Sequence, residues 1–276
     1  MTALRYSVPD LGRTDRKGPL VKDVELLAYD DAGAGPPLVL IHGLTFARQT
    51  WAPIVDALAD RFRCLSIDLP GHGASTGSGA EPAVVVDRLR ATLESAGVSR
   101  PVVIGHSAGA LVAVGYAAQH AVAGVVDVDQ PLLVGPFAAL LQQREGALRG
   151  PDFATAFAPF EQSIGVHLLA EPERTRVAAT RRVEQDLVLD HWALPLSTPP
   201  AEIQPLVDAM LDAIDAPFLY VSGEEVPPPV RDHLAAHLRR LELVALPGSG
   251  HLVHLAHPRR FAEAVADFAT RRRRHA

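Results

Sequence analysis

The stretch PVVIGHSAGALVAVGY, residues 101–116, decides the fold of this chain. Its first apolar residues are β-branched and predict a buried strand, and the Ala-, Leu- and Val-rich end predicts a helix. Between them, GHSAG has the G-x-S-x-G spacing of a tight strand-to-helix turn that leaves one serine at its apex. Gly105 and Gly109 stand where a Cβ would strike the neighbouring helix or strand. Ser107 is therefore a candidate nucleophile above a helix N-terminus, where developing negative charge is favoured.

Length and composition are typical of a globular protein. The chain has 276 residues, 48% of them hydrophobic and 21% charged, which leaves room for one large domain or a domain with an insertion. The net charge is −6, and the chain is more acidic still without its terminal run of four arginines at 271–274. We therefore expect no nucleic-acid partner, and we interpret the arginine run as a solvated helix end.

The single cysteine and the N-terminal segment indicate where the protein works. Cys64 excludes an intrachain disulfide and lies in a predicted strand over 63–67, where it is expected to be buried filler. Residues 1–24 have no apolar core long enough for a signal peptide, and no stretch approaches the ~18 apolar residues of a membrane span. The sequence predicts a cytoplasmic protein without a membrane partner.

Strands alternate with helices along most of the chain. The pattern predicts helices near 51–58, 81–96 and 228–239 and from 258, and strands over 24–29, 37–41, 63–67, 102–104, 124–129, 217–222 and 241–246. Continuous apolar runs such as 37–41 are typical of strands covered on both faces. This alternation predicts a parallel sheet with helices on both faces and a site at the carboxyl ends of the strands.

The alternation stops between residues 131 and 216. No convincing strand occurs there, and the pattern predicts helices over 137–148, 153–169, 173–192 and 201–214. We interpret this stretch as a helical cap, or lid, on the sheet. The expected division is a core domain formed by residues 1–130 and 217–276, with the cap at 131–216.

The chain resembles the α/β-hydrolase superfamily over nearly its whole length. The motifs that carry the resemblance are His42-Gly43, Asp68-Leu69-Pro70-Gly71-His72-Gly73-Ala74-Ser75, Gly105-His106-Ser107-Ala108-Gly109, and Gly250-His251-Leu252-Val253-His254-Leu255 with Pro258. The resemblance implies an α/β fold with a mostly parallel, eight-stranded sheet flanked by helices. It also implies a helical cap inserted after the sixth strand.

The resemblance assigns the reacting groups of a serine hydrolase. Ser107 would be the nucleophile, and a serine hydroxyl needs an adjacent base. His251 follows the last strand, where the superfamily's catalytic histidine falls. The backbone N–H groups of Leu44 and Ala108 would form the oxyanion hole, with Thr45 as the alternative to Leu44.

The acid that orients His251 departs from the commonest pattern. Most relatives carry Gly-x-x-Asp after the seventh strand, but here Gly223 is followed three residues later by Val226. Either Glu224 or Glu225 reaches the histidine, or Asp129 at the end of the sixth strand does so, as in some capped relatives. We favour Asp129 over the two glutamates, because a carboxylate at the mouth of a parallel sheet is costly to bury without a partner. In the remaining alternative, Asp129 only caps the first turn of the lid.

These residues predict a hydrolase of an ester-like bond in a small, largely apolar substrate, working through a Ser-His-Asp triad and an acyl-enzyme. The same triad also serves carbon–carbon bond hydrolases, lactonases, thioesterases and cofactor-free perhydrolases. A further alternative is a non-catalytic protein of this fold that binds a small molecule. We expect His106, His191 and Trp192 at the substrate pocket. The sequence shows no metal-ligand cluster or phosphate loop, and no cofactor is expected.

Overall fold

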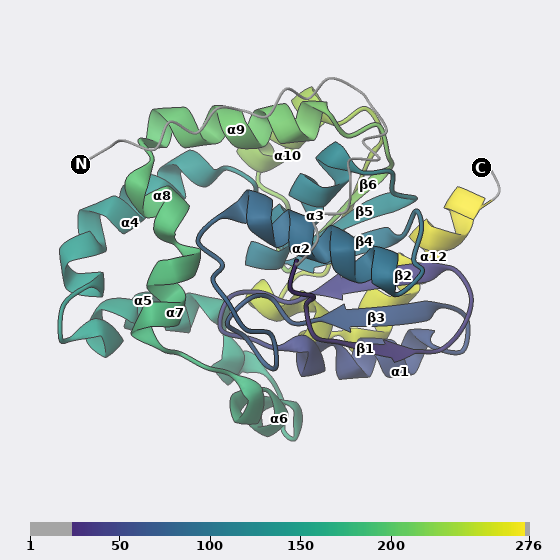
Figure 1. The fold of residues 1–276 in the computed structure, drawn as a ribbon, viewed down its shortest axis with the longest axis horizontal. Helices are drawn as coiled ribbons and strands as arrows, with labels where there is room; N and C mark the ends of the chain where they lie inside the picture. The colour runs from purple at the N-terminus through teal and green to yellow at the C-terminus, as the bar shows by residue number, and fades with distance from the viewer. Residues whose placement is uncertain (1–23, 274–276) are drawn as a thin grey trace.

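A single seven-stranded sheet forms the centre of the computed structural model, which describes residues 24–273 (Figure 1). The strand order is β1-β3-β2-β4-β5-β6-β7. The strands are β1 (Tyr29–Ala32), β2 (Pro37–Ile41), β3 (Arg63–Ile67), β4 (Val102–His106), β5 (Gly124–Val128), β6 (Phe218–Ser222) and β7 (Leu241–Ala245). Only β1 runs antiparallel to its neighbour, β3. The carboxyl ends of the other six strands therefore meet at one edge, as the alternating pattern predicts.

Twelve α-helices surround the sheet in the described part of the chain. They are α1 (Ala52–Leu58), α2 (Pro82–Ser95), α3 (Ala108–Gln119), α4 (Val134–Leu148), α5 (Phe153–Ile164), α6 (Glu173–Thr180), α7 (Gln185–His191), α8 (Ala193–Ser197), α9 (Pro200–Asp212), α10 (Pro228–His237), α11 (Val253–Ala256) and α12 (Pro258–Arg273). Short 3₁₀ turns cover Arg48–Trp51, Val166–Leu168 and Gly250–Leu252.

Alternate residues of each strand pack against different helices, so the helices form two layers. On one face, β2 and β4 residues such as Val39 and Val103 join a hydrophobic cluster with α2, α3, α9 and α10. On the other face, residues such as Leu40 and Ile104 pack with α1 and α12. Both faces are apolar, which explains the continuous hydrophobic runs of the strands. Cys64 is buried in the second cluster, and burial raises the pKa of its thiol to about 12.

The first edge of the sheet differs from the sequence prediction. The expected sheet had eight strands, whereas the described residues form seven. The expected strand over 24–29 lies further along the chain, at Tyr29–Ala32, and includes Asp30 and Asp31. Tyr29 pairs with Ile67 and Ala32 with Cys64, so the backbone pairing with β3 fixes this strand. Charged residues are common on such edge strands, because they discourage further pairing.

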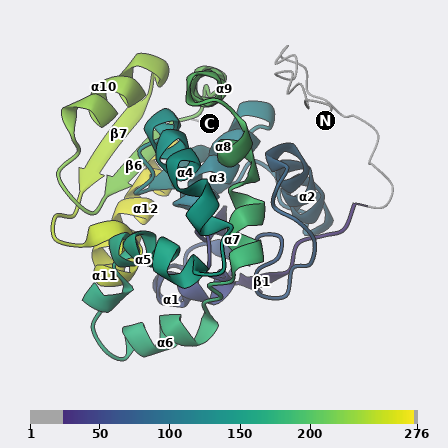
Figure 2. The same ribbon diagram turned by 90° about the vertical axis from the view of Figure 1, so that its left-hand side faces the viewer.

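The stretch between β5 and β6 is helical throughout, with α4 to α9 and one 3₁₀ turn and no strand. Helices α4 to α8 lie beyond the carboxyl ends of the parallel strands (Figure 1), and several of them stand in front of the sheet when the molecule is turned by 90° (Figure 2). The helix expected over 173–192 is broken into α6 and α7, because Arg182 N–H donates to the Thr45 carbonyl oxygen and draws the intervening residues over the loop after β2.

The last helix of this stretch is part of the main core. Ile203, Val207 and Leu211 of α9 are at most 5% exposed and belong to the cluster that covers β2, β4 and β5. The expected core domain and the expected cap at 131–216 therefore share one hydrophobic cluster. The cap remains a proposal.

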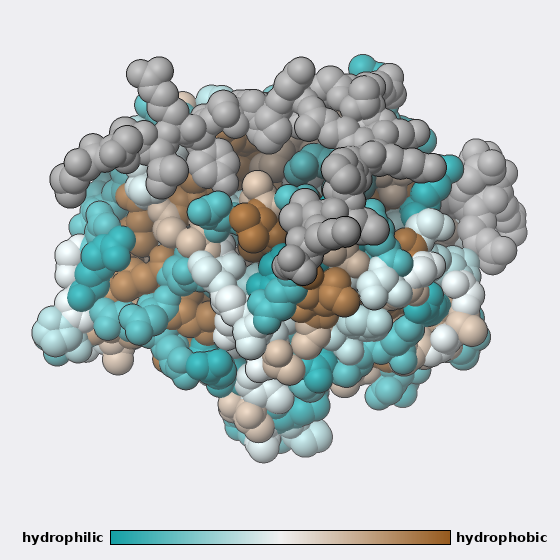
Figure 3. All heavy atoms as spheres, in the orientation of Figure 1, coloured by the Kyte–Doolittle hydropathy of each residue, from teal (hydrophilic) through white to brown (hydrophobic). Residues whose placement is uncertain are grey.

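The surface carries both charged residues and hydrophobic ones. In the space-filling view, hydrophobic residues gather on the left, over the helices between β5 and β6 (Figure 3); Phe137 and Leu140 of α4 are among the exposed hydrophobic side chains. None of the helices in residues 24–273 is long and apolar enough to cross a membrane. Arg271 donates to Glu242. Arg274 lies outside the described residues, as do all but the last residue of segment 1–24, for which no signal peptide is predicted.

His254 is a buried polar residue in α11. Its ring lies 4.5 Å from the Trp51 ring and 4.7 Å from the His106 ring, measured between centroids. Neither ring nitrogen has a hydrogen-bond partner in the described structure. Burial lowers the pKa of His254 to about 3, so the residue is neutral in the folded protein at neutral pH.

Acid should therefore destabilise the fold through His254. The unfolded chain takes up a proton near its ordinary pKa of about 6.5, whereas the folded chain does not, so the stability that this residue contributes is lost as the pH falls from about 6.5 towards 3. Between pH 7.5 and 5.5 the loss is about 1.4 kcal/mol for one such histidine. Replacement His254→Leu should reduce the difference in unfolding free energy between these two pH values by that amount, measured by urea unfolding.

The exposed residue His167 supplies the control: His167→Leu removes a histidine from the surface without touching the core. An unchanged pH difference in His254→Leu would contradict the assignment of acid sensitivity to this ring.

Candidate active site

The turn between β4 and α3 holds Ser107 in an unusual backbone conformation. Its φ is 53° and its ψ is −121°. This backbone conformation is energetically unfavourable for a residue with a side chain, and it persists only where the surrounding structure enforces it. Two glycines allow the turn. A Cβ on Gly105 would lie 2.2 Å from the carbonyl oxygen of Gly109, and a Cβ on Gly109 would lie 2.4 Å from that of Ile41. The sequence prediction about these glycines is confirmed.

The loop after β2 is fastened to the loop after β3 by two buried histidines. His42 Nε2 accepts from Leu69 N–H at 3.0 Å, and His72 Nε2 accepts from Thr45 N–H at 3.1 Å. Each Nδ1 faces a backbone carbonyl oxygen, so each ring is a neutral donor and acceptor. Burial lowers the pKa of His42 to about 4 and that of His72 to about 2. These rings brace the two loops.

This bracing distinguishes the two residues considered for the second oxyanion donor. The Thr45 N–H is committed to His72, whereas the Leu44 N–H has no acceptor among the described residues. Ala108 begins α3, where the first N–H groups of a helix lack intrahelical partners. Leu44 and Ala108 both border the same cavity as Ser107.

Asp129 and His251 meet although 122 residues separate them in the sequence. His251 Nδ1 lies 2.9 Å from Asp129 Oδ2. The other carboxylate oxygen of Asp129 accepts from Gly223 N–H at 3.0 Å and from the Ser222 hydroxyl at 3.2 Å. The carboxylate thus sits between the end of β6 and the histidine, with both oxygens partnered.

A close backbone contact brings His251 to this position. Gly223 follows β6, and a Cβ there would lie only 1.8 Å from the carbonyl oxygen of Gly250. Ser249 N–H also donates to the Gly223 carbonyl oxygen at 3.1 Å. Any side chain at position 223 would push the His251 loop away from Asp129, so the glycine is required.

The alternative acids, Glu224 and Glu225, have no hydrogen bond to His251 in the described structure. Both residues are exposed. Val226, at the position where most relatives have the aspartate, packs against the hydrophobic cluster on one face of the sheet. The geometry therefore pairs His251 with Asp129. Asp127, one pleat earlier on β5, is fully buried, and burial raises its pKa well above the ordinary value.

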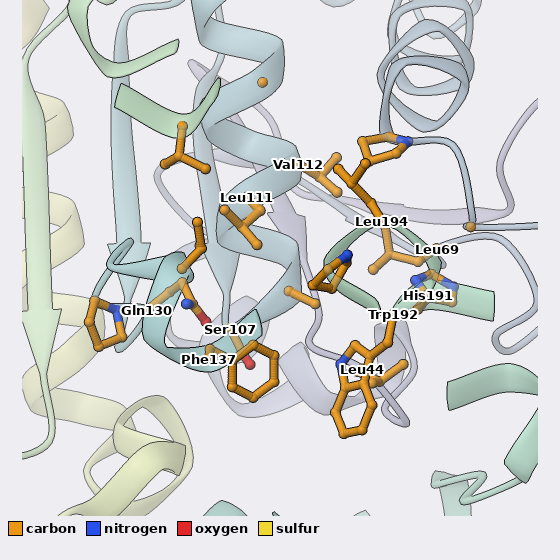
Figure 4. A pocket seen from close by; sticks show the side chains of 18 of the residues that line it. Leu44, Leu69, Ser107, Leu111, Val112, Gln130, Phe137, His191, Trp192 and Leu194 are labelled. Carbon is orange, nitrogen blue, oxygen red and sulfur yellow. The ribbon is translucent and has the colours of Figure 1, made fainter. Parts of the chain in front are cut away.

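A cavity of about 760 Å³ lies between the start of α3 and the helices that follow β5. Figure 4 shows Ser107 at the wall of this cavity, below Leu111 in the view. Ser107, Asp129 and His251 all border the cavity, and its wall is otherwise mostly apolar. Among the described residues that line it, the only charged ones besides Asp129 are Glu224 and any protonated histidine; there is no lysine or arginine.

Two of the three expected pocket residues line the cavity. Trp192 and His191 face it from the insertion (Figure 4), and His191 Nε2 also lies 2.9 Å from the Pro70 carbonyl oxygen. His106 does not line the cavity. It is fully buried, and its Nε2 lies 3.0 Å from the His251 carbonyl oxygen, so it supports the histidine loop from behind. The position of His106 in the G-x-S-x-G motif does not indicate that its side chain is buried away from the cavity.

Sequence reasoning missed the far part of the cavity. One face of α3 lines it from Ala108 through Leu111 and Gly115 to Gln119, and α9 supplies the opposite wall with residues such as Met210. The spacing of three to four residues along α3 was available as a signal, but it equally fits a helix packed into a core.

Comparisons with known proteins agree with this fold. The sequence model of the alpha/beta hydrolase family matches residues 38–264. The 2-succinyl-6-hydroxy-2,4-cyclohexadiene-1-carboxylate synthase of Pectobacterium atrosepticum is 29% identical over 247 residues, which cover 84% of this chain and 93% of that protein.

Solved structures give the same result. The crystal structure of a hydrolase from Pseudomonas aeruginosa superposes with a TM-score of 0.72 at 26% identity, covering 88% of this chain and 93% of that one. An esterase from Thermogutta terrifontis has a TM-score of 0.67 at 22% identity, covering 89% and 93%. With the family match spanning most of its length, the chain belongs to the alpha/beta hydrolase family of enzymes.

Proposed function

We propose that the protein is a serine hydrolase that cleaves an ester-like bond in an elongated, apolar small molecule. The observation that carries this proposal is the placement of Ser107 and the His251–Asp129 pair on one largely apolar cavity. The positive φ of Ser107 supports it, because such strain at a strand-to-helix turn is characteristic of a nucleophile held out from the backbone.

The proposed reaction uses only groups of this chain. Ser107 attacks the carbonyl carbon while His251 takes the hydroxyl proton through Nε2, and Asp129 keeps the proton of His251 on Nδ1. The N–H groups of Leu44 and Ala108 stabilise the oxyanion. His251 then protonates the departing alcohol. A water molecule, activated by the same histidine, releases the acid and restores the serine.

The compound for which the synthase from Pectobacterium atrosepticum is named does not suit this cavity. Its name specifies a succinyl group and a ring carboxylate, and recognition of two carboxylates favours arginine or lysine. The described cavity wall has neither. Arg181 donates a hydrogen bond to the hydroxyl oxygen of the cavity residue Thr45, but its guanidinium is already paired with the Glu161 carboxylate. We therefore assign an uncharged substrate rather than the synthase activity.

The shape of the cavity favours a long acyl or alkyl chain. The lining residues on α3 run from Ala108 to Gln119, about 16 Å at the rise of an α-helix. A chain bound along this face would leave its reacting carbonyl at Ser107 and extend its tail past Gly115 and Met210, which border the same cavity.

The nucleophile can be tested with a fluorophosphonate probe. The intact protein should be labelled at Ser107, because the phosphonate captures a serine activated by a histidine. Ser107→Ala should abolish labelling while leaving the circular dichroism spectrum unchanged. A folded, unreactive wild-type protein would instead support the non-catalytic small-molecule binder.

The acid can be tested by steady-state kinetics on a p-nitrophenyl ester. Asp129→Asn should lower kcat by about 10⁴-fold, because an amide stabilises the wrong tautomer of the histidine. Glu224→Gln and Glu225→Gln should each retain activity. Asp127→Asn is the matched control: Asp127 is a buried carboxyl near the end of the same strand and accepts from the Gln130 N–H at 3.0 Å, a bond that an amide oxygen can keep. A large loss in Glu224→Gln or Glu225→Gln, with an active Asp129→Asn, would refute the assignment.

Chain-length selectivity tests the cavity. A Cβ on Gly115 would lie 3.2 Å from a Val86 methyl group and 3.7 Å from the Met210 sulfur, so Gly115→Met should fill the far end. The kcat/KM for a dodecanoate ester should fall about 10- to 200-fold, while that for an acetate ester should change little. Gly146→Met is the control, since Gly146 lies in α4 with open space around it. Equal losses on both esters in Gly115→Met would contradict this binding mode.

A further inference from the structure

Helices α9 and α10 present metal-ligating side chains to each other, away from the cavity. Asp208 lies on α9, and His233 and His237 lie on α10. One potential ligand atom from each of the three lies within 4.8 Å of the others. The two histidines are four residues apart, so they project from the same side of their helix.

His233 and Asp208 face each other without forming a hydrogen bond. His233 Nε2 is 3.6 Å from Asp208 Oδ1, too far for a hydrogen bond. The same nitrogen is buried and has no hydrogen-bond partner in the described structure. Buried polar atoms normally have a hydrogen-bond partner. A cation between this nitrogen and the carboxylate would give both atoms a partner.

Neighbouring side chains already orient two of the three groups. His237 Nδ1 lies 2.9 Å from Asp212 Oδ1, which leaves Nε2 of that ring available as a ligand. The Gln204 side-chain amide donates to Asp208 Oδ1 at 2.7 Å. Carboxylate and amide partners of this kind hold the ligands of protein metal sites in position and fix the histidine tautomer.

We propose that Asp208, His233 and His237 bind a zinc ion that joins α9 to α10. Two imidazole nitrogens and one carboxylate oxygen are a zinc donor set, with water as the fourth ligand. Tetrahedral zinc with bonds of about 2.0–2.1 Å places its ligands about 3.3 Å apart, close to the 3.6 Å between His233 Nε2 and Asp208 Oδ1.

The ion would fasten a wall of the cavity to the core. Met210, two residues after Asp208, lines the cavity, as do Ile203 and Val207 on the same helix. α10 packs by Val230 and Leu234 against the sheet. Zinc therefore secures the helix that forms the far end of the substrate site, without touching Ser107 or His251.

Isothermal titration of the untagged, chelator-treated protein with zinc chloride tests the proposal. The wild type should bind one zinc ion at this site, and its melting temperature should rise on zinc addition. The double variant His233→Gln/His237→Gln should lose both effects. His167→Gln, which removes an exposed histidine elsewhere, should retain them.

Asp212→Asn provides a second variant on an exposed residue, which should fold normally. It should weaken zinc binding about 10- to 100-fold, because the partner of a ligating histidine is altered. Co²⁺ substitution gives an independent readout, since a tetrahedral site produces strong visible absorption bands that the double variant should lack. Zinc binding to the wild type no tighter than to the double variant, or, if that variant misfolds, no tighter than to Asp212→Asn, would overturn the proposal.

Discussion

The close approach of α3 to β2 and β4 is the contact on which the site depends. Gly105 and Gly109 have no room for a Cβ, because carbonyl oxygens lie within about 2.4 Å of the positions that such atoms would occupy. This contact sets the height at which Ser107 stands above the sheet. It also fixes the direction of the α3 axis, and one side of this helix forms a wall of the cavity. A methyl group at either glycine would move both at once.

Most of the sheet was predictable because its strands are covered on both faces. Runs such as 37–41 and 102–104 have no polar position to confuse with a turn or an amphipathic helix. The first strand was misplaced because Asp30 and Asp31 are charged and its identity rests on backbone pairing with β3. The break between α6 and α7 was likewise invisible, since it depends on a distant carbonyl group, that of Thr45.

The candidate site shows the same division between local and distant information. Ser107 and the loop of His251 follow from motifs, and the proximity of Asp129 follows from the carboxyl ends of adjacent parallel strands. That Thr45 would be occupied by His72, and that His106 would support His251 from behind, required three-dimensional contacts. The sequence places Asp208 four residues before Asp212 and His233 four residues before His237, so each pair lies on one side of a helix. Only the packing of α9 against α10 brings Asp208 close to the two histidines.

The burial of α9 restricts how a substrate can enter. Pulling this helix away would expose Ile203, Val207 and Leu211, at about 1.5–3 kcal/mol for each side chain. α5 and α7 have no comparable attachment to the sheet, because they contribute Phe157 and Val188 to a separate, smaller cluster. α4, by contrast, shares the main cluster with α9 through Val134 and Ala138. For the hydrolase proposed above, exchange of substrate and product is therefore least costly when α5 to α7 move and α9 stays in place, so that the end of the cavity at Ser107 opens while the end at Met210 remains closed.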